Sequence, residues 1–176
     1  MAGFRKAKAE QAAIKMGIYG APGSGKTFTA LLLAEGLAKA AQKRIAYVDT
    51  EHGTDFYCQR VPSRAVHPEA FDFDAIYSRA LTEVSSDVRG LDPQKYGVIV
   101  LDSITHLWEA ARAAYDGRQT KIGTIPMQAW GKIKKPYKDL MAYLLSSPMH
   151  VIICGRQGVE YETDEETDEL KAIGVK

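Results

Sequence analysis

The fold of this chain is decided by the stretch Gly20-Ala21-Pro22-Gly23-Ser24-Gly25-Lys26-Thr27. This stretch matches the pattern G-x-x-x-x-G-K-[ST] at every fixed position, which is typical of a loop that binds nucleotide phosphates. An apolar run over 14–19 precedes it, and a stretch of helix formers over 28–37 follows it. Strand, glycine loop and helix is the order that the motif requires. The alternative, a glycine-rich turn that only caps a helix, has no need of Gly-Lys-Thr in that order.

Each residue type in the loop has a chemical role. Glycines let backbone N–H groups approach phosphate oxygens closely, and the following helix adds unpaired donors and the positive end of its dipole. Lys26 is placed to reach the β and γ phosphates, and Thr27 to bind Mg²⁺ through its hydroxyl. The predicted nucleotide contacts are Gly20, Ala21, Pro22, Gly23, Ser24, Gly25, Lys26, Thr27 and Phe28.

Composition favours one compact α/β domain. The chain has 176 residues, of which 45% are hydrophobic, and this is an ordinary size for a single core. Its net charge of +1 gives no general attraction to nucleic acid or membrane. No apolar stretch approaches the ~20 residues of a membrane span. Cys58 and Cys154 have no metal-ligand spacing, and a reducing cytoplasm is the expected location.

Short apolar runs alternate with helical stretches along the chain. Because strands buried on both faces are short and apolar, and long crossovers separate these runs, the pattern predicts a parallel sheet flanked by helices. Strands are expected over 14–19, 44–49, 98–102 and 150–154, and helices over 27–41, 74–88, 105–115 and 127–145.

The apolar run over 96–101 ends in Asp102. After a phosphate-binding loop, this is the form of a Walker B strand, whose aspartate holds Mg²⁺ directly or through water beside Thr27. The alternative is an aspartate that caps the next helix. Many related ATPases have a glutamate directly after this aspartate to activate water, but this chain has Ser103 there. The catalytic base must therefore come from elsewhere.

Glu51 is the candidate base. It follows the strand over 44–49, and ligands of open α/β sheets bind outside the carboxyl ends of the strands. Glu51 is therefore expected in the same crevice as Lys26 and Asp102. The alternative is that Asp49 and Glu51 only cap a loop.

The segment Asp49-Thr50-Glu51-His52-Gly53-Thr54-Asp55 closely resembles the part of bacterial RecA recombinase and its archaeal and eukaryotic relatives that carries the catalytic glutamate. The order along the chain also matches that family: the phosphate loop comes first, then the segment with Glu51, and then the strand that ends in Asp102. In that family a glutamine that follows the strand corresponding to 150–154 senses the γ-phosphate. The matching position in this chain is Gln157, with Arg156 as a second candidate. The resemblance covers roughly 12–160. It is strongest to small phage-encoded RecA-type ATPases, some of which serve single-strand annealing recombination, and the segment 130–134 also resembles that group.

The resemblance implies a RecA-like P-loop fold with strand order 1-4-3-2 and a fifth strand beside strand 1. Only four strands are recognisable, so we expect the fifth to be missing or C-terminal, and the chain 1–176 to be a single ATPase domain truncated at its C-terminus. The resemblance also implies ATP as substrate, Mg²⁺ as cofactor, and self-assembly into a ring or filament. A phage protein of this kind would act in the host cytoplasm.

Two basic segments are candidate contacts for single-stranded DNA. The segment 116–126 lies where RecA-type proteins carry their first DNA-binding loop, and Arg118 and Lys121 could contact phosphates there; the alternative is an ordinary polar connection. A second cluster is interleaved with aromatic residues, as in proteins that hold single strands by stacking and charge; the alternative is a solvated helix face. The second cluster comprises Lys132, Lys134, Lys135 and Lys138, with Trp130 and Tyr137.

The segment 160–169 contains seven acidic residues. We expect an acidic mobile loop or β-ribbon over 158–171. Because it follows Gln157, where the family's second DNA loop would lie, its charge would repel phosphates. It is therefore expected either to dock on a basic partner or neighbouring subunit, or to be a solvated loop.

Three functions are compatible with these patterns. The leading hypothesis is an ATPase that acts on single-stranded DNA in phage recombination or replication. The first alternative is a nucleotide-dependent assembly or packaging factor without direct DNA contact. The second is a P-loop kinase for a small molecule, but such enzymes usually have an arginine-rich lid, and the segment after Tyr115 has only Arg118.

Overall fold

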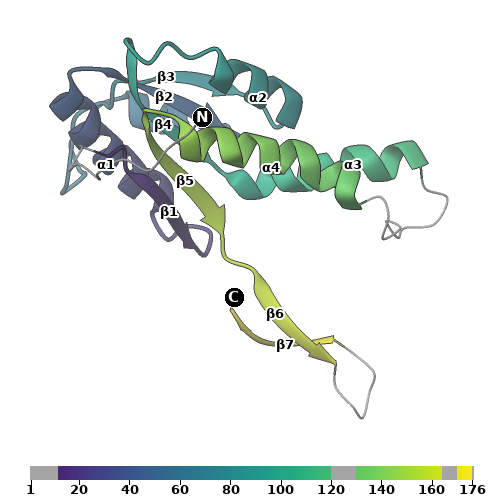
Figure 1. Cartoon of the computed structure of the whole chain (residues 1–176). Helices are drawn as coiled ribbons and strands as arrows, with labels where there is room; N and C mark the ends of the chain where they lie inside the picture. The colour runs from purple at the N-terminus through teal and green to yellow at the C-terminus, as the bar shows by residue number, and fades with distance from the viewer. Residues whose placement is uncertain (1–11, 120–129, 164–169, 176) are drawn as a thin grey trace, which may run out of the picture.

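The structure is a computed structural model that describes residues 12–119, 130–163 and 170–175. It has three layers, a parallel sheet with α1 (Lys26–Ala41) on one face and three helices on the other (Figure 1). Those three are α2 (Leu81–Arg89), α3 (Ile104–Gln119) and α4 (Trp130–Ser146). The predicted fold class, a helix-flanked parallel α/β sheet, is confirmed.

All neighbouring strands of the main sheet are parallel, in the order β1-β5-β4-β2-β3. A short 3₁₀ helix, η1 (Thr54–Cys58), follows β2. The strands are β1 (Lys15–Gly20), β2 (Arg44–Asp49), β3 (Asp74–Tyr77), β4 (Tyr96–Asp102) and β5 (His150–Arg156).

The strand order agrees with the expectation over four strands and differs at one edge. The four expected strands follow one another as β1, β5, β4 and β2, but the fifth strand is β3, beside β2 rather than beside β1. The helix expected over 74–88 was wrong in its first part, because β3 occupies Asp74–Tyr77 and α2 begins only at Leu81. Ile76 shares the apparent helical spacing of Leu81 and Val84, yet it lies on a strand.

The central strand β4 supplies apolar side chains to both faces of the sheet. Val98 and Val100 pack in the cluster on the α1 side, whereas Ile99 and Leu101 pack with α2, α3 and α4. All four are fully buried. Successive side chains of a strand point to opposite faces, so a continuous apolar run is what a doubly covered strand requires. These two cores fix the position of Asp102, the last residue of β4.

Beyond β5 the chain forms a separate antiparallel ribbon, β6 (Val159–Thr163) and β7 (Leu170–Val175). Figure 1 shows this ribbon extending away from the main sheet. The acidic segment expected over 158–171 thus contains β6 and the first two residues of β7, and its residues 164–169 lie outside the described part of the chain. None of the helices in the described part combines the length and apolar character that a bilayer crossing requires.

A cluster of charges anchors the edge strand β3. Arg44 Nη2 donates to Asp74 Oδ1 at 2.7 Å and Arg44 Nε donates to Asp74 Oδ2 at 3.0 Å. The Tyr96 hydroxyl also donates to Asp74 Oδ2, at 2.8 Å. The Arg44 guanidinium, and then the Tyr96 hydroxyl, hold the pKa of the Asp74 carboxyl well below its usual range.

We expect Asp74→Asn to lower the free energy of unfolding by about 1 kcal/mol at pH 7, the scale of a partly exposed ion pair with good geometry. Because the pKa of Asp74 is lower in the folded chain than in the unfolded one, its contribution is present above about pH 4, the unfolded value, and is lost as the pH falls below it. Urea denaturation of the wild-type and Asp74→Asn proteins at several pH values measures the difference between their free energies of unfolding.

The control is Asp72→Asn, because Asp72 also pairs with Arg44 but its side chain is 84% exposed. The anchoring role would be contradicted if Asp74→Asn lowered the free energy of unfolding no more than Asp72→Asn does. It would also be contradicted if the loss caused by Asp74→Asn persisted in acid.

Candidate nucleotide site

The loop between β1 and α1 has the shape that a phosphate group needs. Gly23 and Gly25 have φ values of +76° and +85°, in the left-handed region that glycine adopts at little cost. Gly25 is also the N-cap of α1, and no side chain caps the helix there. The first N–H groups of α1 therefore remain available to an anion at the positive end of the helix dipole.

The polar side chains at the fixed positions of the motif are those of the last two residues of the loop, Lys26 and Thr27. Lys26 Nζ folds back over the loop and donates to the carbonyl oxygens of Gly20 at 3.0 Å and Ala21 at 2.9 Å. The Thr27 hydroxyl donates to Asp102 Oδ2 at 2.6 Å. The structure thus brings together Lys26, Thr27 and Asp102, as the motifs predict.

Asp102 is held from a second side by a residue that the sequence analysis missed. The Tyr47 hydroxyl, on β2, donates to the same oxygen, Asp102 Oδ2, at 2.9 Å. Burial, and then the charge of Asp102, raise the pKa of Tyr47, so the phenol stays protonated and remains a donor. A tyrosine inside an apolar strand carries no sequence signal that separates it from ordinary core residues.

The oxygen atoms of Thr27 and Asp102 suit Mg²⁺. This ion prefers hard oxygen ligands and is usually held by one or two carboxylates together with substrate phosphates and water. In the part of the chain that the structure describes, no group of three or more His, Cys, Asp or Glu side chains is placed to hold a metal alone. A hydroxyl and one carboxylate beside a phosphate loop therefore fit Mg²⁺ that arrives with a nucleotide.

Glu51 faces this site and is paired with Arg156. Glu51 Oε1 accepts a hydrogen bond from Arg156 Nε at 3.2 Å, and Glu51 Oε2 lies 3.2 Å from Arg156 Nη2. Both side chains are part-exposed. They line one cleft of about 200 Å³ together with the loop. The residues that line it are Pro22, Gly23, Gly25, Lys26, Thr27, Glu51, Tyr57, Asp102 and Arg156.

Asp49 and Glu51 differ sharply in their surroundings. Asp49 is buried and accepts four hydrogen bonds at 2.6–3.0 Å, from the N–H groups of Glu51, His52 and Thr54 and from the Thr54 hydroxyl. It shapes the loop that carries Glu51. The capping alternative considered for both carboxylates therefore describes Asp49, whereas the Glu51 carboxylate points into the cleft.

The strand β5 ends with Arg156, and not Gln157, in the cleft. Arg156 pairs in register with Gly20 on β1, and its side chain reaches Glu51. Gln157 contacts β1 through its backbone N–H, which donates to the Gly20 carbonyl oxygen at 3.2 Å. Neighbouring residues of an extended chain point in opposite directions, so only one of the two can face Glu51.

Phe28, also predicted as a nucleotide contact, packs against aromatic and core residues beside the loop. Its ring stacks on Tyr57, with 6.2 Å between the ring centroids, and packs at the edge of the α1-side core. Tyr57, on η1, is the aromatic residue that lines the cleft in the described part of the chain. Tyr57 lies eight residues after Asp49 in a segment without helical or strand periodicity, so no sequence pattern predicts its place in the cleft.

Thr50 and His106 form a buried connection behind the cleft that the sequence analysis also missed. The Thr50 N–H donates to the Asp102 carbonyl oxygen at 2.8 Å, and Thr50 Oγ1 accepts from the Ser103 N–H at 2.8 Å, across a cis Asp102–Ser103 peptide bond. His106 Nδ1 lies 3.0 Å from Thr50 Oγ1. The available signal was the position of His106 in the first turn of the helix that follows Asp102.

The candidate DNA contacts are only partly described. Lys121 and the side chain of Arg118 lie outside the described part of the chain. On α4, Lys132, Lys134 and Lys135 are exposed to solvent. The Trp130 ring stacks on Trp108, with 6.1 Å between the centroids, so its stacking surface is partly used within the protein.

Three comparisons with known proteins bear on this site. A protein-family model described as an AAA domain matches residues 12–176. No curated protein matches the sequence. Among solved structures, the crystal structure of the RadB recombinase superposes with a TM-score of 0.49 and 22% sequence identity, over 88% of this chain and 66% of that one. Since the family model extends over nearly the whole sequence and includes the phosphate loop, the chain belongs to the AAA domain family.

Proposed function

We propose that this protein binds Mg²⁺-ATP in the cleft and hydrolyses it to ADP and phosphate. The observation that carries the proposal is the convergence of three motifs that are distant in sequence: Thr27 hydrogen-bonded to Asp102, with Glu51 lining the same cleft. This arrangement combines a phosphate loop, a metal-ligand pair and a carboxylate at a single site.

The loop and Lys26 would hold the phosphates. Lys26 Nζ would exchange the carbonyl oxygens of Gly20 and Ala21 for the β- and γ-phosphate oxygens, which carry full charge and are stronger acceptors. Thr27 and Asp102 would hold Mg²⁺, whose positive charge would neutralise the charge on the β- and γ-phosphate oxygens. Tyr47 keeps Asp102 in place by its hydrogen bond to Oδ2.

Glu51 would act as the general base. Its carboxylate takes a proton from the water that attacks the γ-phosphorus, while the bond to the bridging oxygen of ADP breaks and the electron pair leaves with ADP. Arg156 would donate to the γ-phosphate oxygens and stabilise their charge. When Arg156 binds phosphate and no longer pairs with Glu51, the Glu51 carboxylate would be free to contact water.

We further propose single-stranded DNA as the partner on which hydrolysis acts, in phage recombination or replication, with copies of the chain assembled in a ring or filament. The exposed lysines of α4 support this by their charge. The alternative is an assembly or packaging factor without direct DNA contact. The Trp108–Trp130 stack favours it, because a ring packed on its own protein offers less surface to a base.

Replacing Glu51 tests the catalytic assignment. We expect Glu51→Gln to bind ATP with nearly unchanged affinity but to hydrolyse it at least ~100-fold more slowly, the usual scale for loss of a general base. Phosphate release and equilibrium binding of the nucleotide measure the two quantities. The matched control is Glu69→Gln, an exposed glutamate paired with Arg60 away from the cleft. Near-normal turnover in Glu51→Gln would show that Glu51 is not the base.

The DNA partner is tested by the ATPase rate with and without single-stranded DNA, at low and at physiological salt. If DNA binds through phosphate contacts, we expect stimulation that weakens as salt rises, and we expect Lys134→Glu to reduce it without changing the rate in the absence of DNA. Absence of stimulation together with absence of DNA retention at low salt would favour the assembly factor.

A further inference from the structure

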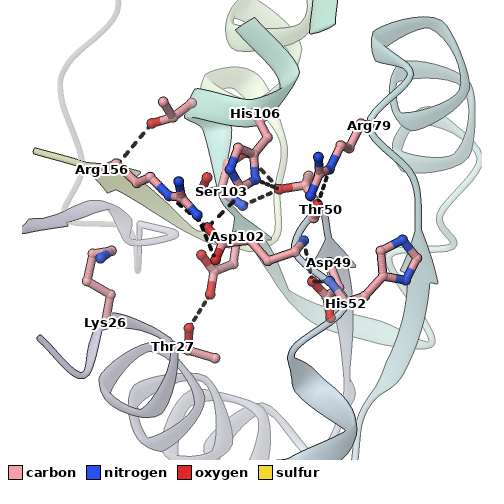
Figure 2. A network of polar contacts seen from close by, with 12 residues as sticks. Lys26, Thr27, Asp49, Thr50, His52, Arg79, Asp102, Ser103, His106 and Arg156 are labelled. Carbon is pink, nitrogen blue, oxygen red and sulfur yellow. Dashed lines mark hydrogen bonds and ion pairs between the residues drawn. The ribbon is translucent and has the colours of Figure 1, made fainter. Parts of the chain in front are cut away.

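A buried histidine lies at the back of the cleft, outside all of the recognised motifs. The side chain of His106, on the first turn of α3, is only 8% exposed. Its Nδ1 atom is 3.0 Å from Thr50 Oγ1 and 3.7 Å from Glu51 Oε1. Figure 2 shows the ring directed toward Thr50. Neither phosphate binding nor the metal-ligand pair requires an imidazole at this place.

The other hydrogen bonds of Thr50 are compatible with His106 Nδ1 as the donor in this pair. Thr50 Oγ1 accepts the Ser103 N–H at 2.8 Å and lies 3.3 Å from the Ser103 carbonyl oxygen, which can take the single hydroxyl hydrogen. With the hydroxyl hydrogen on the Ser103 carbonyl oxygen, the remaining lone pair accepts from His106, and we assign the tautomer whose hydrogen is on Nδ1. Two oxygen atoms lie near Nδ1, Thr50 Oγ1 at 3.0 Å and Glu51 Oε1 at 3.7 Å.

Glu51 Oε1 lies between two nitrogen donors. Arg156 Nε is 3.2 Å away and donates to it, whereas His106 Nδ1, at 3.7 Å, is just beyond hydrogen-bond distance. When Arg156 turns to a phosphate, Glu51 loses its partner in the cleft. A shift of well under 1 Å toward His106 would then give the carboxylate a new hydrogen bond.

We propose that His106 is a positioning residue for Glu51. Once Arg156 has engaged the γ-phosphate, the single Nδ1–H is shared between Thr50 Oγ1, which orients the ring, and Glu51 Oε1, which is thereby held at the cleft. The remaining carboxylate lone pairs stay directed at water, and His106 itself neither gives up nor takes a proton. This inference rests on the proposed ATP hydrolysis and on Glu51 as its base.

The test compares two substitutions of His106. We expect His106→Ala to lower kcat about 10- to 100-fold, the scale of one hydrogen bond to a charged group. KM for ATP is expected to stay unchanged, because His106 contacts no part of the nucleotide site that binds phosphate. His106→Asn should restore most of the rate, since its side-chain amide nitrogen can occupy the place of Nδ1.

The matched control is His150→Ala, at the opposite end of β5, where His150 Nδ1 accepts from the Ile14 N–H at 2.9 Å. We expect it to leave kcat unchanged. Thermal unfolding of every variant checks that the fold is retained. If His106→Ala does not fold, His106→Gln replaces it, because the longer side chain fills the space but places its amide beyond Nδ1, and the same loss of kcat is expected.

A double substitution separates this role from a purely structural one. If His106 acts through Glu51, adding His106→Ala to Glu51→Gln should cause no further loss of rate. A normal kcat in His106→Ala, or an additional loss in the double variant, would overturn the inference while leaving the proposed function intact. Normal turnover in Glu51→Gln alone would overturn the proposed function, and the inference with it.

Discussion

The parallel register of the central strands is the constraint on which the cleft depends. Asp49 on β2 lies opposite Asp102 on β4, Asp102 lies opposite Cys154 on β5, and Arg156 lies opposite Gly20 on β1. The carboxyl ends of four strands therefore meet at one edge. A slip of one residue would turn every side chain of a strand to the other face, and Asp102 would lose Thr27. The two cores that share β4 make such a slip costly.

The buried polar groups around the cleft have a different role from the part-exposed ones. Asp49 and Thr50 are buried and hydrogen-bonded, and they hold the loop and the β4–α3 turn rigidly. The Glu51–Arg156 pair is part-exposed, and such pairs contribute only about 0–1 kcal/mol. A phosphate group, with its larger charge, can therefore separate the pair at little cost. The strength of each contact thus matches whether the proposed reaction requires it to persist or to change.

Motifs with fixed spacing were predictable from the sequence, and contacts between distant segments were not. The phosphate loop and Asp102 are recognisable because local chemistry restricts each position. The strand β3 was missed because it is only four residues long and is held by Arg44, thirty positions earlier. The choice between Arg156 and Gln157 depends on where β5 ends, which its apolar run leaves open. The contact between Thr50 and His106 joins residues 56 positions apart.

The most direct test of the central claim is a crystal structure of the protein with Mg²⁺, ADP and aluminium fluoride, a mimic of the transferred phosphoryl group. The account predicts phosphates in the loop Gly20–Thr27, Lys26 moved from the carbonyl oxygens to the phosphates, and the metal ion between Thr27 and Asp102. It also predicts that Arg156 contacts the fluoride group and no longer pairs with Glu51. A nucleotide bound away from the loop, or an intact Glu51–Arg156 pair beside the fluoride group, would contradict it.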